Sequence, residues 1–575
     1  MTSSDASKWD VLVIGGGHNG LVAAATLGKS GRKVLVLEAA REVGGAARTE
    51  EFAPGFRASP AHLLNRLHPE VVKTLELEKH GLVLSGATPT PNPSPQGGGE
   101  YGSSSTQQKV STITAKPAPI SSPSPLWGEA RGGGASLASS IALSRDGNPL
   151  ALHGAYGVSL TGTSHSEQAA WREFRAQLFR YAGILKPLLT RRPPDLGNMS
   201  LMESSAFAMT GLSLRRLGKE DMRDFLRMLL MNVSDVADEH LEDDRLKGLL
   251  AFDATLGSHL GPRSPTSLLG LYYRLAGELD GRLGAQMMPA GGMGAVISAI
   301  LSAAKAAGVS LRADAPAMKI LIDKGRAAGV VLESGEEIRA RTIISAINPR
   351  TTFLDLVGTH EIDTGFVRRI KNIRMKGNVA KLHLALDRPP EFSGVDAAGY
   401  RGRLIIAPSS DHVERAFNPA KYGGFSPEPV MEITLPSLSD PTLAPDGACV
   451  LSAIVQYAPY ALKEGWEAGR PKFLKAIMAQ LELYAPGIGR LVRHAELLTP
   501  ADIEARYRMP GGHWHHGELQ ADQMMMSRPA FGAAGYDTPV DGLYLCGAGS
   551  HPGGGISGVP GLNAARRILE MRDRP

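Results

Sequence analysis

Apolar and polar positions change their spacing several times along the chain, and the first change comes close to the start. Residues 11–14 form a short, wholly apolar run, which predicts a buried parallel strand. From Leu21 the spacing becomes helical and rich in alanine, and Gly31 ends that predicted helix. A second apolar run over 33–38 predicts another buried strand. The pattern therefore predicts a strand–helix–strand unit.

Similar patterns return in the middle and near the end of the chain. Residues 289–349 predict a helix, a hairpin over 319–338 and a strand over 342–347. Residues 542–547 predict one more strand, followed by a glycine-rich turn and a helix that begins near Ser557. We expect these segments to return to the first unit, which would make that domain discontinuous.

The remaining chain reads as a second, mixed half. Apolar residues at helical spacing predict helices over 166–189, 220–241, 246–260 and 267–279. Residues 377–390 and 448–460 alternate as sheet strands, and 141–154 predict a hairpin that turns at Asp146–Gly147. Methionines in the helices could line a lipid-like pocket, although methionine at helical spacing is more often a core residue.

Between the first strand and helix, Gly15, Gly17 and Gly20 have the G-x-G-x-x-G spacing. Such glycines allow a tight turn, close approach of a diphosphate and close packing of helix on strand. The helix N-terminus supplies amide groups and a positive dipole to phosphates. Glu38, after the second strand, would accept hydrogen bonds from a ribose diol and disfavour a 2′-phosphate. The unit therefore predicts dinucleotide binding; a purely structural turn is the alternative.

The segment after Glu38 carries a glycine doublet, Gly44 and Gly45, between Arg41 and Arg48. With the preceding motif, it resembles the flavin-dependent oxidoreductases that include phytoene desaturases, retinol saturases and flavin amine oxidases. The resemblance implies FAD as the cofactor, with the arginines near its diphosphate. Solvated surface arginines are the alternative.

The same resemblance implies cofactor contacts at Ala317 and Ala346. The glycine-rich C-terminal segment, which a flavin enzyme of this type returns to the first domain, adds Gly547, Gly555 and Ile556, and His551 is a candidate from its place in that turn. The helix after the glycine-rich turn could direct its positive end at the flavin N1–C2=O edge and stabilise the anionic reduced form.

Segments beginning at Pro289, Ser439 and Gly547 are similar to the phytoene desaturase-like branch. Segments beginning at Leu246 and His515 are similar to the pyridine nucleotide-disulphide oxidoreductase domain-containing protein 2 group. The predicted fold class is α/β, with a GR2-like, discontinuous Rossmann-type FAD-binding domain over 1–86, 286–365 and 532–575. A mixed α+β substrate or cap domain would occupy 137–285 and 366–531.

Three histidines lie close together in the segment Gly-Gly-His-Trp-His-His-Gly-Glu, residues 511–518. No known zinc spacing is present, so no metal is predicted. His516 and Glu518 are candidates for catalysis because they could line the flavin or substrate cavity; ordinary polar packing is the alternative.

Residues 87–136 differ from the rest of the chain. Eight prolines fall between Pro89 and Pro125, among glycines and serines and few apolar side chains. Such a segment cannot offset its ordering entropy, so we expect disorder. Its composition is typical of a translated palindromic DNA element inserted into a surface loop; a partner-binding tether is the alternative.

The net charge is +5, and the 62 Lys and Arg are spread along the chain, so no nucleic-acid partner is predicted. The two cysteines form no C-x-x-C pair. No run of apolar residues predicts a membrane span, and no leader is seen, so the predicted location is cytoplasmic, with peripheral membrane contact as an alternative.

These features predict an FAD-dependent oxidoreductase that moves a hydride between flavin N5 and a hydrophobic, polyene or lipid-like substrate. Its electron acceptor and oligomeric state are left open. A flavin-binding regulatory or interaction protein with little turnover, and a flavin amine oxidase, are the alternative functions.

Overall fold

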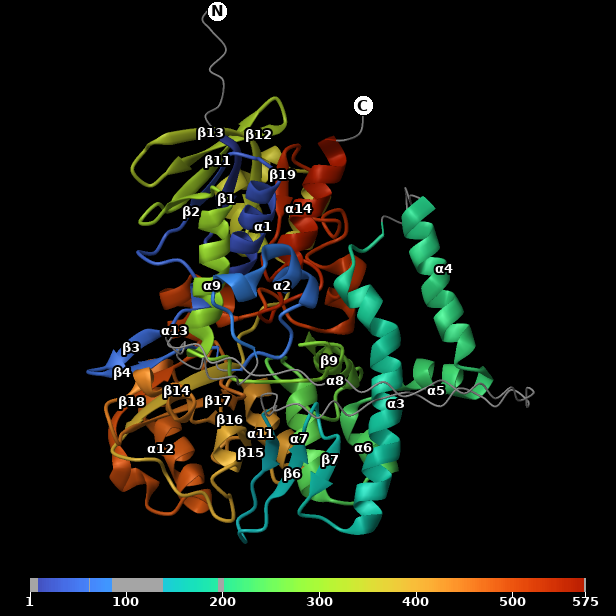
Figure 1. The fold of residues 1–575 in the computed structure, drawn as a ribbon, viewed down its shortest axis with the longest axis vertical. Helices are drawn as coiled ribbons and strands as arrows, with labels where there is room; N and C mark the ends of the chain where they lie inside the picture. Colours follow the sequence, from blue (N-terminus) through green and yellow to red (C-terminus); the bar gives the residue numbers. More distant parts are fainter. Residues whose placement is uncertain (1–8, 62, 85–137, 195–200, 573–575) are drawn as a thin grey trace, which may run out of the picture. The chain divides into compact units, whose positions relative to one another are not determined.

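The apolar runs at the two ends and in the middle of the chain meet in one sheet, of which Figure 1 labels β1, β2, β11, β12, β13 and β19. The computed structural model describes residues 9–61, 63–84, 138–194 and 201–572, so the predicted insertion at 87–136 lies outside the described residues. The parallel strands are, in spatial order, β10 (Ser310–Arg312), β2 (Val34–Leu37), β1 (Trp9–Ile14), β13 (Glu337–Ser345) and β19 (Leu543–Leu545).

The N-terminal part of β13 continues into an antiparallel meander with β12 (Arg326–Leu332) and β11 (Ala317–Asp323). This is the hairpin that the sequence predicts. All strands of the first sheet fall within the ranges predicted for the FAD-binding domain, while the exact domain boundaries remain a prediction.

Alternating side chains of the parallel strands enter two different cores. Val11 and Val13 face a cluster formed with α1 (His18–Lys29), α9 (Gly292–Ala306) and α14 (Val559–Arg572), whereas Leu12 and Ile14 face a cluster beyond the opposite side of the sheet. Helix α1 packs so closely on α14 that a Cβ at Gly561 would lie 2.2 Å from the Asn19 carbonyl. Glycine is thus required where the last helix crosses the first.

A second sheet comes from the part of the chain predicted as the substrate half. Its spatial order is β18 (Val492–Leu498), β14 (Val379–Leu386), β17 (Cys449–Gln456), β16 (Met431–Thr434), β15 (Arg403–Ile406), β5 (Ser140–Ala142), β6 (Leu150–His153) and β7 (Ser159–Thr161). Strands β15 and β5 are parallel neighbours, while the other neighbouring strands run antiparallel. One face is apolar and packs on α12 (Trp466–Tyr484), while the other carries polar residues described below.

Helices complete this half: α3 (His165–Thr190), α4 (Leu201–Arg216), α5 (Lys219–Leu230), α6 (Val233–His240), α7 (Asp244–Thr255) and α8 (Leu268–Leu275). The prediction of one helix over 220–241 is wrong. The chain turns at Asn232, whose side chain accepts from the Asp235 amide at 2.8 Å and caps a new helix.

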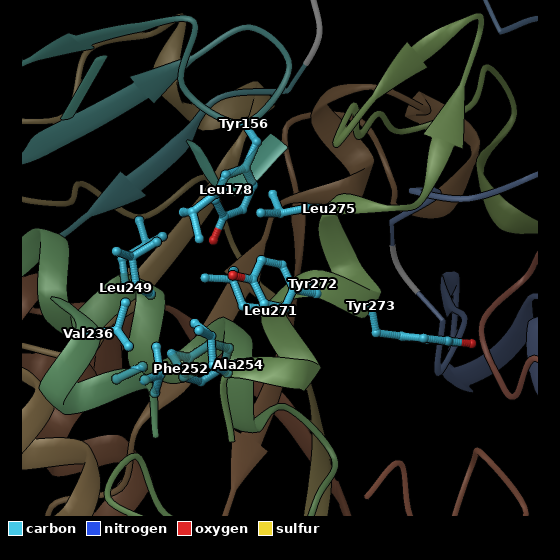
Figure 2. Close-up of a cluster of buried hydrophobic side chains, with 14 of the residues drawn as sticks. Tyr156, Leu178, Val236, Leu249, Phe252, Ala254, Leu271, Tyr272, Tyr273 and Leu275 are labelled. Carbon is cyan, nitrogen blue, oxygen red and sulfur yellow. The ribbon is translucent and has the colours of Figure 1, made fainter. Parts of the chain in front are cut away.

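The core of this helical layer is mostly aliphatic and aromatic. Figure 2 shows Tyr272 among Leu271, Phe252 and Leu275; Tyr273 belongs to the same cluster, but its ring extends away from these side chains. Consecutive residues of α8 thus serve different surroundings, and Tyr273 reaches the cavity described below.

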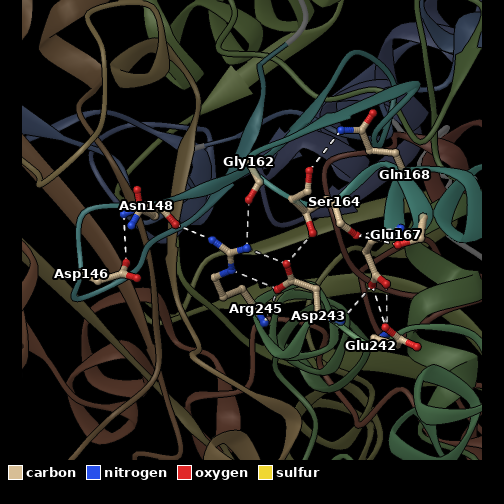
Figure 3. Close-up of polar contacts among 11 residues, drawn as sticks. Asp146, Asn148, Gly162, Ser164, Glu167, Gln168, Glu242, Asp243 and Arg245 are labelled. Carbon is tan, nitrogen blue, oxygen red and sulfur yellow. Dashed lines mark hydrogen bonds and ion pairs between the residues drawn. The ribbon is translucent and has the colours of Figure 1, made fainter.

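A polar network joins the β6–β7 hairpin to α7 (Figure 3). Arg245 pairs with Asp243 and donates to the backbone carbonyls of Gly162 and Asn148. The Glu167 carboxylate accepts from the Asp243 amide at 3.0 Å and from that of its predecessor at 3.1 Å. These bonds fix the start of α7, whose far end reaches the cavity.

The remaining elements are short. They are α2 (Pro69–Leu75), α10 (Thr364–Lys371), α11 (Ser410–Phe417), α13 (Pro500–Tyr507), and the hairpins β3 (Glu50–Ala53) with β4 (Phe56–Ala58) and β8 (Glu278–Leu279) with β9 (Arg282–Leu283).

Candidate cofactor and substrate site

A cavity of about 420 Å³ lies where the carboxyl ends of β1 and β13 approach the polar face of the second sheet. Its lining comes from the surroundings of both sheets. The segments around the first sheet contribute Gly15, Glu38 and Ala346, and the second sheet with its helices contributes Asp253 and Glu432. Ligands of open parallel sheets bind at this edge of the strands.

The glycine motif forms the tight turn that its spacing predicts. Gly15 has φ +98°, and its amide donates to the Leu37 carbonyl at 2.8 Å. A Cβ at Gly20 would lie 2.2 Å from the Gly15 carbonyl, so α1 could not come this close to the turn with any side chain there. A Cβ at Gly17 would meet nothing within 4 Å. The first turn of α1 carries no acid, which leaves its positive end open to a phosphate group.

Glu38 holds the turn and faces the cavity. One carboxylate oxygen accepts from the Gly16 amide at 2.7 Å and the other from the Ala40 amide at 2.8 Å. Each oxygen keeps a further acceptor direction, so the carboxylate can still receive the hydroxyls of a ribose.

Most predicted cofactor residues line this cavity. Besides Gly15, Gly17, Gly20 and Glu38, they are Gly44, Gly45, Ala317, Ala346, Gly555 and Ile556. Their cofactor contacts remain predictions.

Four predicted cofactor residues do not line the cavity. Arg41 is exposed, and Arg48 pairs with Glu50 and lies 5.5 Å from the centre of the Tyr507 ring. Gly547 allows close packing, because its Cβ would lie 2.5 Å from the Ala346 carbonyl. His551 is fully buried, and its carbonyl accepts from the Tyr536 hydroxyl at 2.9 Å.

The structure adds lining residues that the sequence analysis did not single out. His18 and Asn19 occupy the variable positions of the glycine motif, and Asn65, Arg66 and Tyr273 come from segments with no motif. His18 and Asn19 could have been predicted as lining residues from their position inside the motif. No local sequence pattern indicated Asn65, Arg66 or Tyr273.

Several buried polar atoms at the cavity have no hydrogen-bond partner among the described residues. They are His18 Nε2, Asn19 Oδ1, His515 Nδ1 and His516 Nδ1. Buried polar groups in proteins are nearly always paired. Together with the open glycine turn and Glu38, these atoms fit a large polar ligand such as a dinucleotide.

The histidines near the cavity are held neutral. Burial, followed by the charge of Arg528, lowers the pKa of His516 to about 4 and that of His513 to about 3. Burial also lowers the pKa of His18 to about 4. At neutral pH these imidazoles act as hydrogen-bonding groups and carry no charge.

The two catalytic candidates separate in the structure. His516 lines the cavity in a left-handed backbone conformation, φ +53°. Glu518 does not line it: its carboxylate accepts from Gln520 at 2.6 Å and from Arg374 at 3.4 Å. Burial raises the pKa of Glu518. This geometry gives Glu518 a structural role in the 515–528 segment.

A group of charged residues, here called the polar wall, lies on the opposite side of the cavity: Asp253 and Glu432 line the cavity, and Arg403 and Lys381 belong to the group without lining it. Arg403 is fully buried and donates to both oxygens of Asp253, at 2.6 and 2.5 Å, and to Glu432 at 2.7 Å. Lys381 and Glu432 both lie opposite Ile454 in the second sheet, on the face towards the cavity. Burial lowers the pKa of Lys381 to about 7, against the influence of Glu432.

A cluster of metal ligands or a membrane-spanning helix would indicate a different kind of site. No cluster of three or more His, Cys, Asp or Glu with metal-binding geometry occurs in residues 9–61, 63–84, 138–194 and 201–572. Within the same ranges, no helix has both the length and the apolar character needed to cross a membrane.

Comparisons with known proteins agree with this geometry. Residues 13–75 match the family model of the NAD(P)-binding Rossmann-like domain, and residues 122–569 match that of the flavin-containing amine oxidoreductases. The second match covers most of the chain; it includes the whole second sheet and the strands of the first sheet other than β1 and β2, while the first match includes β2 and the end of β1.

Curated relatives include the "pyridine nucleotide-disulfide oxidoreductase domain-containing protein 2" of Mus musculus, 34% identical over 98% of this chain and 93% of the relative. A limonene dehydrogenase subunit of Castellaniella defragrans is 26% identical, covering 99% and 95%. The "phytoene desaturase (neurosporene-forming)" of Cereibacter sphaeroides is 27% identical, covering 56% and 60%. The resemblance identified in the sequence is thus confirmed, as is the predicted fold class.

The predicted cofactor and reaction type follow from the same findings. A Rossmann-like dinucleotide unit and a flavin-family match over most of the chain indicate FAD and redox chemistry. The chain belongs to the flavin-containing amine oxidoreductase family and is an FAD-dependent oxidoreductase.

Proposed function

We propose that the protein moves a hydride between FAD and a carbon centre of a hydrophobic substrate, of polyene or lipid-like character. The observation that supports this most is the continuity of the cavity. It runs from the Gly15–Gly20 turn to a region lined by Ala254, Leu256, Ile454, Met509, Trp514 and Leu519. These side chains suit an apolar molecule and exclude water from the reacting atoms.

Residues of the first half would hold the cofactor. Glu38 would receive the ribose hydroxyls, and the amides at the start of α1 would face the diphosphate. Bound FAD supplies a hydride acceptor at N5, which the protein must orient and shield. Gly554 and Gly555 let the backbone of this turn pack against His515 and Arg66, because a Cβ at Gly554 would lie 2.0 Å from His515 and one at Gly555 would lie 2.5 Å from Arg66.

Formation of a C=C bond removes a hydride from one carbon and a proton from the next, so the site needs a proton acceptor. His516 is a weak base here, because its pKa is about 4. Glu432 lines the cavity, and Lys381, which lies across Ile454 from Glu432 on the same face of the sheet, has a pKa of about 7. We assign the proton to this pair, with Glu432 as the group at the cavity and Lys381, in its neutral form, as the base behind it.

Two relatives support the substrate class by name. One is called a limonene dehydrogenase subunit and the other a phytoene desaturase. Limonene and phytoene are hydrocarbons, which agrees with the apolar part of the cavity.

The first experiment is to purify the protein, record its visible spectrum and identify the cofactor released on denaturation. FAD is expected. Anaerobic addition of cyclic terpenes, polyenes and unsaturated lipids should then bleach the flavin absorbance with at least one of them. Bound FAD that no hydrocarbon or lipid reduces would contradict the proposed substrate class.

Amine oxidation is the second candidate function, favoured by the two carboxylates of the polar wall that reach the cavity, Asp253 and Glu432. An amine substrate would reduce the flavin and, in air, give hydrogen peroxide. Peroxide release with amines, and none with hydrocarbons, would decide for this candidate.

A further inference from the structure

Two arginines, the partly buried Arg66 and the fully buried Arg528, flank the glycine turn Gly553–Gly555 at one end of the cavity. Arg66 lines the cavity, and its guanidinium carbon lies 3.7 Å from the centre of the Tyr273 ring. It donates to the Tyr273 carbonyl at 2.5 Å and to the Gly554 carbonyl at 3.4 Å. The Tyr273 hydroxyl donates to the same Gly554 carbonyl at 2.8 Å. Arg66 is therefore fixed against the glycine turn.

Arg528 lies on the other side of the same turn and is 2% exposed. Its guanidinium donates to five backbone carbonyls at distances of 2.5 to 3.3 Å: those of His515, Ala548, Glu518, Gly517 and Gln523. His515 and Ala548 line the cavity. The charge of Arg528 thus lies directly behind the cavity wall.

These two arginines differ from the arginine of the polar wall in their charge balance. Arg403 meets two carboxylates. Within the part of the chain that the structure describes, neither Arg66 nor Arg528 forms an ion pair with a carboxylate. A buried cation without a counter-charge is costly, because it has lost its hydration.

The groups around Arg528 do not neutralise its positive charge. Burial lowers the pKa of Arg528 to about 10, which still leaves it protonated at neutral pH. Neighbouring histidines stay neutral, in part because of Arg528: His513, His515, His516 and His551. Among the described residues, one end of the cavity therefore presents a fixed positive potential that no carboxylate pairs with directly.

The geometry points to Arg66 and Arg528 as the residues that stabilise the negative charge gained by the bound flavin when it is reduced. This inference rests on the proposed function and on the expected position of the flavin pyrimidine edge near the start of α14. A hydride brings two electrons and one proton, so its transfer adds one negative charge to the ring system. Positive charge at this edge favours the reduced form and raises the reduction potential.

The test compares Arg528→Met with Arg528→Lys in the FAD-loaded protein, by reductive titration against a reference dye. Loss of the charge in R528M should shift the ratio of reduced to oxidised flavin about tenfold towards the oxidised form at fixed potential. For a two-electron couple this equals a midpoint about 30 mV lower. R528K keeps the charge and should stay close to the wild type. Equal shifts in both variants would assign Arg528 a purely structural role and overturn the inference.

Arg66→Met and Arg66→Lys provide the second, independent pair, and the same pattern is expected. Weaker FAD binding by R66M with an unchanged midpoint would mean that Arg66 serves the diphosphate, which overturns its part of the inference. If R528M does not fold, R66M decides alone. Arg227→Met is the charge-matched control, because Arg227 is an exposed residue of α5 paired with Glu239, and it should leave the midpoint unchanged.

The two proposals fail in different ways. A wild-type protein that binds no FAD would contradict the proposed function before any variant is made. A protein that binds FAD, whose midpoint ignores both arginines, would contradict this inference alone.

Discussion

The two sides of the cavity offer different groups to a ligand. On the side of the first sheet, these groups are glycines, backbone amides and the end of one helix, within a short stretch of chain. On the polar wall, they come from charged side chains that pair across the fold, such as Arg403 with Asp253, 150 residues apart. Backbone contacts suit a cofactor shared by many enzymes, whereas paired side chains can be changed singly and suit a specific substrate.

The largest effect should come from breaking the polar wall. Arg403→Met leaves Asp253 and Glu432 buried without their main partner, which should lower the free energy of unfolding by about 3–5 kcal/mol. Chemical denaturation measures this. Arg312→Met is the matched control: its pair with Glu336 has side chains 41% and 48% exposed, so a loss of about 0–1 kcal/mol is expected. Similar losses in both variants would show that burial of the polar wall is unimportant.

The glycine side should break differently. Gly20→Ala places a Cβ 2.2 Å from the Gly15 carbonyl, so we expect about 1–3 kcal/mol of destabilisation together with loss of FAD. Gly17→Ala meets no protein atom within 4 Å and should weaken FAD binding while the apoprotein keeps its melting temperature. Calorimetry of the apoproteins and flavin absorbance of the loaded proteins separate the two effects. An apoprotein of G17A that melts early would contradict this distinction.

Lys381 should make stability depend on pH. Its pKa falls from the ordinary value to about 7 on folding, so the unfolded chain binds more protons between pH 7 and the unfolded pKa. Stability should therefore rise with pH through this window, by at most about 1.4 kcal/mol per pH unit, and be constant below it. In Lys381→Met this contribution disappears. Unfolding curves at several pH values test it; identical slopes in both proteins would place the charge of Lys381 in solvent.

The smallest effect is expected at Glu38. Glu38→Ala removes the acceptor for the Gly16 and Ala40 amides and for the ribose, and FAD affinity should fall about tenfold, or about 1.4 kcal/mol. Titration of apoprotein with FAD measures the change. Unchanged affinity would remove Glu38 from the cofactor site.

The sequence predicted the first sheet because its signals are local: apolar runs for β1 and β2, glycine spacing for the turn, and a glycine-rich helix start for α14. Most residues predicted to contact the cofactor line the cavity, some found from the same local signals and others from the family resemblance; their contacts with the cofactor stay predictions. The helix over 220–241 was wrong because one capping side chain, Asn232, outweighed a continuous apolar pattern.

The polar wall and the two arginines at the Gly553–Gly555 turn, Arg66 and Arg528, could not be predicted from the sequence. Lys381 reads as an ordinary residue of an alternating strand, and Arg528 as a surface arginine before a proline. Their burial, and hence their chemistry, arises only when strands and loops distant in sequence meet. Glu518, a candidate from its neighbourhood to histidines, turned out to be bound by Arg374 and Gln520.

The position of β19 beside β13 has a consequence for synthesis of the protein. β1 and the Gly15–Gly20 turn are translated long before β19, so β13 can pair with β1 and β12 but lacks β19 until residues 543–545 have left the ribosome. Helix α14, which covers α1, follows later still. During synthesis, one edge of β13 and the side of α1 that faces α14 therefore stay uncovered until these later segments have been translated.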